Sequence, residues 1–432
     1  MQKSKIKISI SLLAVMFTAA ACGLVPDQPA KLTELIWWKT FDDGRALQPV
    51  ISAFQKSNPG IKITFVQKNV DTYEAELIDA LAAGEGPDIF TIHNDWLPRY
   101  QDKLTPAPAK VWNIKDYKQA FVDAASFDLV DYASQQIYAV PLSMDVLSLY
   151  YNKDLLASAG IARPPATWQD LVAQVPKLTR QDSLGNFLRS AVALGTADNI
   201  NRAPDILGLM MLQNGTSVYS PDHSKTDLGS IVQGPDNVSF TPAVRALEFY
   251  TQFSNPAKTT YTWNSRSLNS IDAFAAGKVA MIFSYSYLAG TLAQKAPFLK
   301  YGIAAVPQIE GADLRVNFAN YWAEGVAKQS EHPTEAWQFL KYISQKNVLS
   351  QYYTAVKHVA SRPDILESQI TDPDIGVFAE NALSAKSFFK PDSDAVETIF
   401  VQMINDVVLR NVQPADAVRA ASQKINLLLR SQ

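Results

Sequence analysis

The order of strand and helix signals early in the chain restricts its fold more than any other feature of the sequence. These signals alternate as strand, helix, strand, helix and strand over residues 35–40, 47–54, 61–65, 73–81 and 87–92. The motif "NPG" ends the first helix and Gly84 ends the second. Parallel strands joined by right-handed helical crossovers form a doubly wound sheet, which binds ligands beyond the carboxyl ends of its strands. We therefore expect an α/β fold whose site lies in the loops after these strands.

The length of 432 residues favours two or three lobes, because a single core rarely grows to that size. A second β/α region follows the first. Thr167, with Asp170 three residues later, predicts a capped helix. Thr241 before a proline predicts another helix start, and residues 279–283 predict a strand. Residues 185–240 are rich in Asn, Gly, Ser and Asp, and we expect loops and short helices there.

The composition excludes several classes of partner and of site. The chain has 39 basic and 42 acidic residues, a net charge of -3 and no long run of one sign, which argues against nucleic acid as a main partner. The four histidines show no metal-binding spacing. The sequence holds no P-loop, no GxSxG motif and no dinucleotide-binding glycine fingerprint. We therefore expect no metal, no cofactor and no catalytic residues.

The N-terminus has the layout of a secretory signal. Three lysines precede an apolar run over residues 8–21, which ends in small residues at Cys22, the only cysteine of the chain. Residues 1–22 resemble a bacterial lipoprotein signal, in which Cys22 is lipidated and anchors the protein to a membrane. Ala19 stands where such signals usually have leucine, and simple secretion is the alternative. Residues 23–30 are expected to form a short tether.

Five blocks of the sequence follow one another in an order that is typical of one family. They are "GEGPDIFTIHNDW" (84–96), "YAVPLSMDVLSLYYNKDLLASAGI" (138–161) with "PPATWQDL" after it, "AFAAGKVAMIFSYSYL" (273–288), "GIAAVPQ" (302–308) and "EGVAKQSEHPTEAWQFLKYIS" (324–344). With these blocks the chain resembles the family 1 extracellular solute-binding proteins, the maltose-binding-protein-like receptors of ABC importers.

The resemblance implies a type II periplasmic-binding-protein-like fold, in which two α/β lobes hold a solute in the cleft between them. Each lobe would be a β-sheet flanked by helices. The implied limits are 31–143 with 325–358 for lobe one, 147–320 with 365–432 for lobe two, and 143–147, 320–325 and 358–365 for the hinge. The resemblance also implies an extracytoplasmic receptor that delivers a small solute to an ABC permease. We expect a monomer that is not an enzyme.

Asp145 is the one carboxylate in the apolar half of the 138–161 block. On the implied map this stretch crosses between the lobes, so Asp145 is expected to face the solute. The alternative is an acid that pairs with a lysine or caps a turn. Tyr150 and Tyr151 follow it in a context that is typical of core packing, and we leave them out of the site.

The other candidate residues for solute binding follow predicted strands or lie at the second crossing. They are Trp38, Asp42, Asp43, Asn94, Asp95, Trp96, Tyr285, Tyr287, Tyr321 and Trp322. One of Asp42 and Asp43 is expected to cap the next helix instead. The alternative for the group around Asp95 is a surface loop. The alternative for Tyr321 and Trp322 is packing of the hinge, and one of the two tyrosines of "SYSY" is expected to pack between the lobes.

The expected solute is a carbohydrate, most simply a short oligosaccharide. Carboxylates preserve the hydrogen bonds that sugar hydroxyls lose on leaving water, and aromatic rings cover the apolar faces of a pyranose. Acids and aromatics near strand ends favour neutral polyols or cations over anions. The alternatives are another solute, such as a polyamine, a glycerol phosphate or an iron complex, and a glycoside hydrolase that uses cleft carboxylates.

Overall fold

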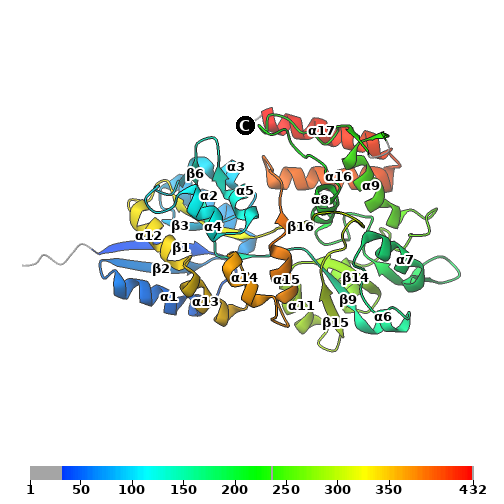
Figure 1. Cartoon of the computed structure of the whole chain (residues 1–432), viewed down its shortest axis with the longest axis horizontal. Coiled ribbons are helices and arrows are strands. Elements are labelled where there is room, and N and C mark those ends of the chain that lie inside the picture. The colour runs from blue at the N-terminus through cyan, green and yellow to red at the C-terminus, as the bar shows by residue number, and fades with distance from the viewer. Residues whose placement is uncertain (1–31, 235–236, 431–432) are drawn as a thin grey trace, which may run out of the picture.

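The computed structural model describes residues 32–234 and 237–430, so Cys22, the signal and the tether lie outside the described residues. Two lobes lie side by side, and each holds a β-sheet with helices on its faces (Figure 1). The predicted α/β architecture with two lobes is confirmed. Within the described ranges, no helix is both long and apolar enough to cross a membrane.

The first sheet has the strand order β2 (Ile61–Gln67), β1 (Thr33–Lys39), β3 (Ile89–His93), β17 (Trp322–Ala327) and β4 (Leu104–Thr105), and β17 also pairs with β7 (Ala139–Pro141). β1 is parallel to both β2 and β3, which confirms the predicted crossovers. β17 enters from a distant part of the chain and is antiparallel to β3. The helices of this part are α1 (Gly44–Ser57), α2 (Val70–Ala83), α3 (Leu97–Tyr100), α4 (Ile114–Ala120), α5 (Asp123–Leu129), α12 (Pro333–Ile343) and α13 (Lys346–Val356), with a 3-10 turn at Gln101–Lys103.

The second sheet has the strand order β10 (Arg180–Gln181), β11 (Phe187–Val192), β14 (Val279–Ser284), β9 (Ser148–Asn152) and β15 (Tyr301–Ala304). Its helices are α6 (Lys153–Ser158), α7 (Trp168–Leu178), α8 (Ala203–Gln213), α9 (Pro242–Thr251), α10 (Ser270–Ala275), α11 (Tyr287–Lys295), α16 (Ser393–Arg410) and α17 (Pro414–Arg430), with a 3-10 turn at Gln252–Ser254. The strand β14 is confirmed. The expectation of only loops and short helices over 185–240 is wrong for β11, because this strand is stabilised by pairing with β14, far along the chain.

Three segments cross between the two sheets and pair with one another. β8 (Ser143–Met144) is antiparallel to β18 (Val359–Ala360), and Val146 forms an isolated bridge with Ala319 beside β16 (Asn317–Phe318). The implied limits of the hinge and of the lobes stay a prediction. The remaining elements are β5 (Val130–Asp131), β6 (Gln136–Ile137), β12 (Val232–Gln233), β13 (Ser239–Phe240), β19 (Ala385–Lys386), α14 (Pro363–Gln369) and α15 (Gly376–Ala382).

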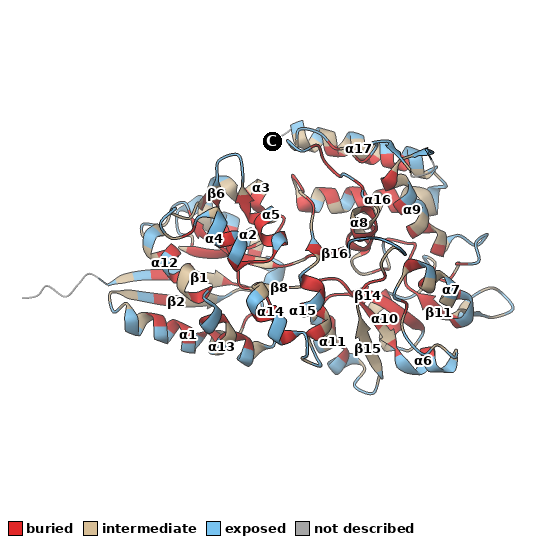
Figure 2. Cartoon of the chain, in the orientation of Figure 1, coloured by how far each residue is buried: buried red, intermediate tan, exposed pale blue. Residues whose placement is uncertain are grey.

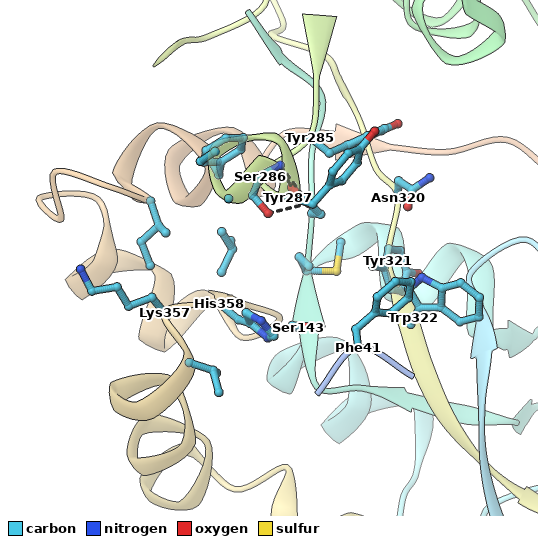
Figure 3. A pocket seen from close by; sticks show the side chains of 18 of the residues that line it. Phe41, Ser143, Tyr285, Ser286, Tyr287, Asn320, Tyr321, Trp322, Lys357 and His358 are labelled. Carbon is cyan, nitrogen blue, oxygen red and sulfur yellow. Dashed lines mark hydrogen bonds between the residues drawn. The ribbon is translucent and has the colours of Figure 1, made fainter. Parts of the chain in front are cut away.

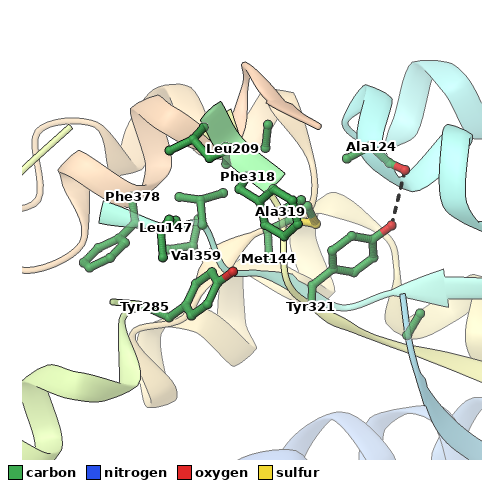
Figure 4. Packing of buried hydrophobic residues seen from close by; sticks show 14 of the residues in the cluster. Ala124, Met144, Leu147, Leu209, Tyr285, Phe318, Ala319, Tyr321, Val359 and Phe378 are labelled. Carbon is green, nitrogen blue, oxygen red and sulfur yellow. Dashed lines mark hydrogen bonds between the residues drawn. The ribbon is translucent and has the colours of Figure 1, made fainter. Parts of the chain in front are cut away.

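Buried residues occur in both lobes and in the crossing segments (Figure 2), and the apolar ones among them form one continuous cluster. Met144, Phe318 and Val359, one from each crossing segment, lie close together there (Figure 4). Beside them the Tyr321 hydroxyl donates to the carbonyl of Ala124 at 3.3 Å. The three segments therefore share a small core, which holds them together as one connection between the lobes.

Two predicted helix starts differ in their chemistry. Thr167 and Asp170 form a capping box at α7, as predicted, with a 3.0 Å hydrogen bond from the Asp170 backbone N–H to the Thr167 hydroxyl. Thr241 also precedes its predicted helix, α9, but its side chain makes no cap hydrogen bond. The predicted helix start at Thr241 is confirmed, but a capping residue type does not by itself fix the side-chain geometry that a cap hydrogen bond requires.

Candidate functional site

A cavity of about 650 Å³ lies between the two lobes (Figure 3). Its walls include residues 39–42, which follow β1, and residues 285–290, which follow β14. Residues 374–378 close one side. All three crossing segments complete the lining, at 143–145, 320–322 and 356–359. The cavity thus lies beyond the carboxyl ends of strands from both sheets, which is where doubly wound proteins bind their ligands.

Asp145 lines this cavity and also caps the start of α11. Its Oδ1 accepts from the Val146 backbone N–H at 2.8 Å, and its Oδ2 accepts from the Ser286 backbone N–H at 3.0 Å and hydroxyl at 2.6 Å. Burial raises the pKa of Asp145 to about 7, although these donors oppose the rise. No lysine or arginine of the described residues pairs with it. Asp145 therefore lines the cavity and also caps a helix start, whereas its contact with a solute stays a prediction.

The loop after β1 contributes a buried ion-pair network to the cavity. Lys39 Nζ lies 3.0 Å from Asp42 Oδ2 and 2.5 Å from Glu324 Oε1, and Glu324 is fully buried. The Tyr352 hydroxyl also donates to Asp42. Burial opposes the charged form of Asp42, but Lys39 and His358 hold its pKa below the ordinary value. Asp42 is therefore a charged group in a fixed position.

Two buried polar atoms on the cavity have no hydrogen-bond partner within the described part of the chain. They are Thr40 Oγ1 and His358 Nδ1. Burial lowers the pKa of His358, although Asp42, whose Oδ1 lies 3.6 Å from His358 Nδ1, opposes the change. Buried polar groups are normally paired in folded proteins, so these two atoms are unusual features of the cavity wall.

Aromatic rings lie on either side of the cavity. Phe41 and Trp322 lie together, with ring centroids 5.6 Å apart, and Phe41 is 60% exposed (Figure 3). Tyr287 is half exposed, and its hydroxyl donates to Asn201 Oδ1 at 2.9 Å. Tyr285 is buried, and its hydroxyl donates to Asp205. The rings of Phe41 and Tyr287 are therefore open to a ligand, whereas Trp322 is half-buried against the core and Tyr285 packs the wall.

Three residues of the cavity adopt a left-handed backbone conformation. The φ angles are 64° for Phe41, 61° for Arg202 and 52° for Lys357. This conformation costs energy in residues with a Cβ atom, and such strain concentrates at binding and active sites because the surrounding structure is selected to hold it. Lys357 adopts it as the C-cap of α13, an ordinary place for this conformation, so the strain on the cavity is confined to Phe41 and Arg202.

The model of the bacterial extracellular solute-binding protein family matches residues 38–346 of the chain, which include both walls of the cavity. The chain belongs to this family. The galactooligosaccharide-binding protein of Bacillus subtilis is 24% identical over 381 residues, which cover 84% of each chain. The sn-glycerol-3-phosphate-binding periplasmic protein of Yersinia pestis is 27% identical over 184 residues, 40% of each chain.

Solved structures confirm the fold as the type II class of two-lobed binding proteins. The cyclic alpha-maltosyl-1,6-maltose binding protein from Arthrobacter globiformis has a TM-score of 0.76 at 19% identity, over 93% of this chain and all of the other. As a member of the family, this solute-binding protein works outside the cytoplasm with the membrane subunits of an ABC importer. The match is to a family of binding proteins rather than enzymes.

The structure of this solute-binding protein brings together about half of the predicted site residues. Those on the cavity are Asp42, Asp145, Tyr285, Tyr287, Tyr321 and Trp322. Those that do not line it are Trp38, Asp43, Asn94, Asp95 and Trp96. Contact with a solute stays a prediction for all of them.

Three of the residues off the cavity have other partners. Asp43 caps α1 by accepting from the Arg45 backbone N–H at 2.8 Å, so Asp42 is the acid of that pair that reaches the cavity. Trp38 lies under Lys68, whose Nζ is 3.8 Å from the ring centroid. Trp96 is buried and stacks on Tyr100 with centroids 5.1 Å apart. Its place in the packed core explains why a strand-end position did not lead to the cavity.

Asn94 and Asp95 border a second cavity of about 480 Å³, next to residues 127–133 and 388–390. Asp95 is buried, and its two oxygens lie 2.8 Å from Lys390 Nζ and 2.5 Å from His93 Nδ1. Burial opposes ionisation, but the two basic partners hold the pKa of Asp95 well below its ordinary value. The carboxylate is therefore ionised and committed to these partners.

Sequence reasoning missed several residues of the cavity. They include Lys39, Thr40, Phe41, Arg202, Ser286, Asn320, Lys357 and His358. Phe41, Ser286 and Asn320 are neighbours in sequence of predicted residues, so a wider selection around each strand end would have found them. Arg202 lies in a stretch without a clear pattern, and only the fold brings it to the site. No group of three metal ligands occurs in the described part of the chain.

Proposed function

We propose that this protein captures a carbohydrate, in the form of a short oligosaccharide, in the cleft between its lobes and delivers it to the permease of an ABC importer. The observation that carries the proposal is the combination of exposed aromatic rings with hydrogen-bonding oxygen atoms around one cavity. Phe41 and Tyr287 supply the exposed faces, and the half-buried Trp322 lies beside Phe41. Asp145 and Thr40 supply oxygen atoms for hydroxyl groups.

This arrangement suits a sugar for physical reasons. A pyranose has apolar C–H faces that pack on aromatic rings and hydroxyls that must remain hydrogen-bonded after they leave water. Hydrogen bonds to a carboxylate are worth about 1.5–3 kcal/mol each, more than those between neutral groups. A ligand that touches both lobes binds the closed arrangement more tightly and shifts the population towards it. No covalent step is needed. The Bacillus subtilis relative, named for galactooligosaccharide binding, supports this solute class.

The proposal includes attachment of the receptor to the cell membrane through a lipid on Cys22, with the protein acting as a monomer. The signal-like segment that ends at the only cysteine supports the anchor. Mass spectrometry of the purified protein tests it, because a lipidated N-terminal cysteine adds the mass of its acyl chains. A mature chain without that added mass would favour simple secretion.

A thermal-shift screen of sugars tests the solute class. A bound solute stabilises the folded protein by RT ln(1 + [L]/Kd), so the correct class is expected to raise the melting temperature. Analysis of the same samples for products separates binding from hydrolysis, because sugar turnover would favour a glycosidase. Failure of all sugars would contradict the proposal.

Glycerol phosphate is the second candidate, because Arg202, Lys357 and His358 also line the cavity and a Yersinia pestis relative is named for that solute. However, Arg202 is paired with Asp205 and Glu397, and Lys357 with Asp374. These ion pairs leave less positive charge for a phosphate. Including glycerol 3-phosphate in the screen decides between the two, since a shift with this compound and none with sugars would favour the second candidate.

A further inference from the structure

A buried ammonium group joins the two lobes outside the cavity. Lys390 lies just before α16 in the second lobe, and its Nζ is 2.8 Å from Asp95 Oδ2, just after β3 in the first lobe. The two side chains are only 6% and 4% exposed. Burial opposes the charge of Lys390, but the carboxylates of Asp95, Glu397 and Asp205 raise its pKa above the ordinary value. The interaction is therefore a permanently charged contact between the lobes.

From Lys390 a chain of contacts leads to the cavity wall in lobe two. Lys390 Nζ lies 3.3 Å from Glu397 Oε1, and the same oxygen accepts from Arg202 Nη2 at 3.2 Å. Arg202 Nε in turn donates to Asp205 Oδ2 at 2.7 Å, which also accepts from the Tyr285 hydroxyl at 2.7 Å. Arg202 and Tyr285 both line the cavity. The position of Arg202 thus depends on a carboxylate that Lys390 shares.

A second chain leads back to the cavity from Asp95. The other Asp95 oxygen is 2.5 Å from His93 Nδ1, and His93 Nε2 is 3.2 Å from Asn320 Oδ1. Asn320 belongs to the second crossing segment and lines the cavity. The His93 ring also meets Trp322 edge to face, with centroids 5.1 Å apart. Both chains of contacts that start at Lys390 and Asp95 therefore end on residues that line the cavity.

We propose that Lys390 is a positioning residue that couples solute capture to the arrangement of the lobes. Its ammonium holds Asp95 of one lobe and the Glu397–Arg202 pair of the other, and so favours the arrangement in which both walls of the cavity face each other. The proposal goes beyond the identity of the solute, because it concerns the energetic balance between lobe arrangements in the empty protein as well as in the bound one.

Removal of the ion pair tests this role. The double variant Asp95→Asn with Lys390→Met takes away both charges and leaves Glu397 paired with Arg202. Small-angle X-ray scattering of the solute-free protein is expected to show a larger radius of gyration than in the wild type. Solute affinity is expected to fall on the order of tenfold, a typical size for coupling between sites. The variant Lys390→Arg keeps the positive charge. Its radius of gyration and its solute affinity are expected to lie between those of the double variant and those of the wild type.

Lys62→Met is the matched control. Lys62 forms a 2.9 Å ion pair with Glu34 in which both side chains are about half exposed, and it lies off the cavity. Exposed pairs contribute little, so this variant is expected to resemble the wild type. The proposal would be overturned if the double variant had the same radius of gyration as this control. It would also be overturned if the double variant lost solute affinity without any change in its radius of gyration. If no sugar binds even to the wild type, the proposed function fails, while the scattering comparison still decides the role of Lys390.

Discussion

The carboxyl group of Asp145 is held by three donors and has no cationic partner among the described residues, so its charge state is sensitive to pH. Burial raises its pKa to about 7, above the value of about 3.9 for an unfolded aspartate. If the carboxylate accepts hydrogen bonds from solute hydroxyls, affinity is expected to rise as the pH increases from about 6 to 8. Asp145→Asn is expected to bind more weakly at pH 8 and to show little of this pH dependence. Isothermal titration calorimetry across that range measures both effects.

The same pKa shift has a consequence for stability. The folded protein binds the proton of Asp145 more tightly than the unfolded chain does, so this group lowers the free energy of unfolding as the pH rises from about 4 to 7. In Asp145→Asn this contribution is absent. The stability of the variant relative to the wild type is therefore expected to improve across that interval, as urea denaturation at several pH values would show. A constant difference would contradict the raised pKa.

Two substitutions of Phe41 distinguish the loss of solute binding from the relief of backbone strain. Its ring is 60% exposed on the cavity while its φ angle is 64°, a conformation that glycine adopts without strain. Phe41→Gly is expected to weaken solute binding yet to lose little stability or gain about 0.5–1 kcal/mol, because the strain is relieved. Phe41→Ala is the matched control that also loses the ring but keeps the strain. Equal stabilities of the two variants, measured by chemical denaturation, would contradict the account.

At the scale of helices, two threonines that look alike in sequence allow a direct comparison. The Thr167 hydroxyl accepts the Asp170 backbone N–H at 3.0 Å, whereas the Thr241 side chain makes no cap hydrogen bond. Thr167→Ala is expected to cost about 1 kcal/mol of stability, and Thr241→Ala distinctly less. Both positions are off the cavity, so solute affinity is expected to stay unchanged. Urea denaturation of the two variants measures their losses of stability. Equal losses would contradict the role of the Thr167 cap hydrogen bond.

The elements that could be predicted from the sequence are those with local signals. The β1-α1-β2-α2-β3 order, the α7 capping box and β14 each depend on residues close together in the chain. β11 could not be predicted, because its pairing with β14 comes from sequence far away. The role of Asp95 could not be predicted for the same reason. The sequence predicted its position after a strand, but its partner Lys390 lies 295 residues later. Arg202 reaches the cavity only through tertiary contacts.

For the whole molecule, the three crossing segments carry the chain between the lobes, so the lobes are expected to change their relative position more easily than their internal structure. A solute with contacts on both walls of the cavity then favours closure, in proportion to its extra affinity for the closed arrangement. A solute that touched one wall alone would stabilise its lobe without closing the protein.

Combined scattering and thermal measurements distinguish these cases. At a solute concentration about 100 times Kd, linkage adds about 2.7 kcal/mol to the free energy of unfolding, which raises the melting temperature by several degrees. We expect the same solute to reduce the radius of gyration in small-angle scattering. A sugar that raises the melting temperature without compaction would place its site on one lobe, and would contradict a cavity formed by residues from both β1 and β14 as the place of binding. Because the two readouts respond to different contacts, agreement between them would assign the solute to the cleft.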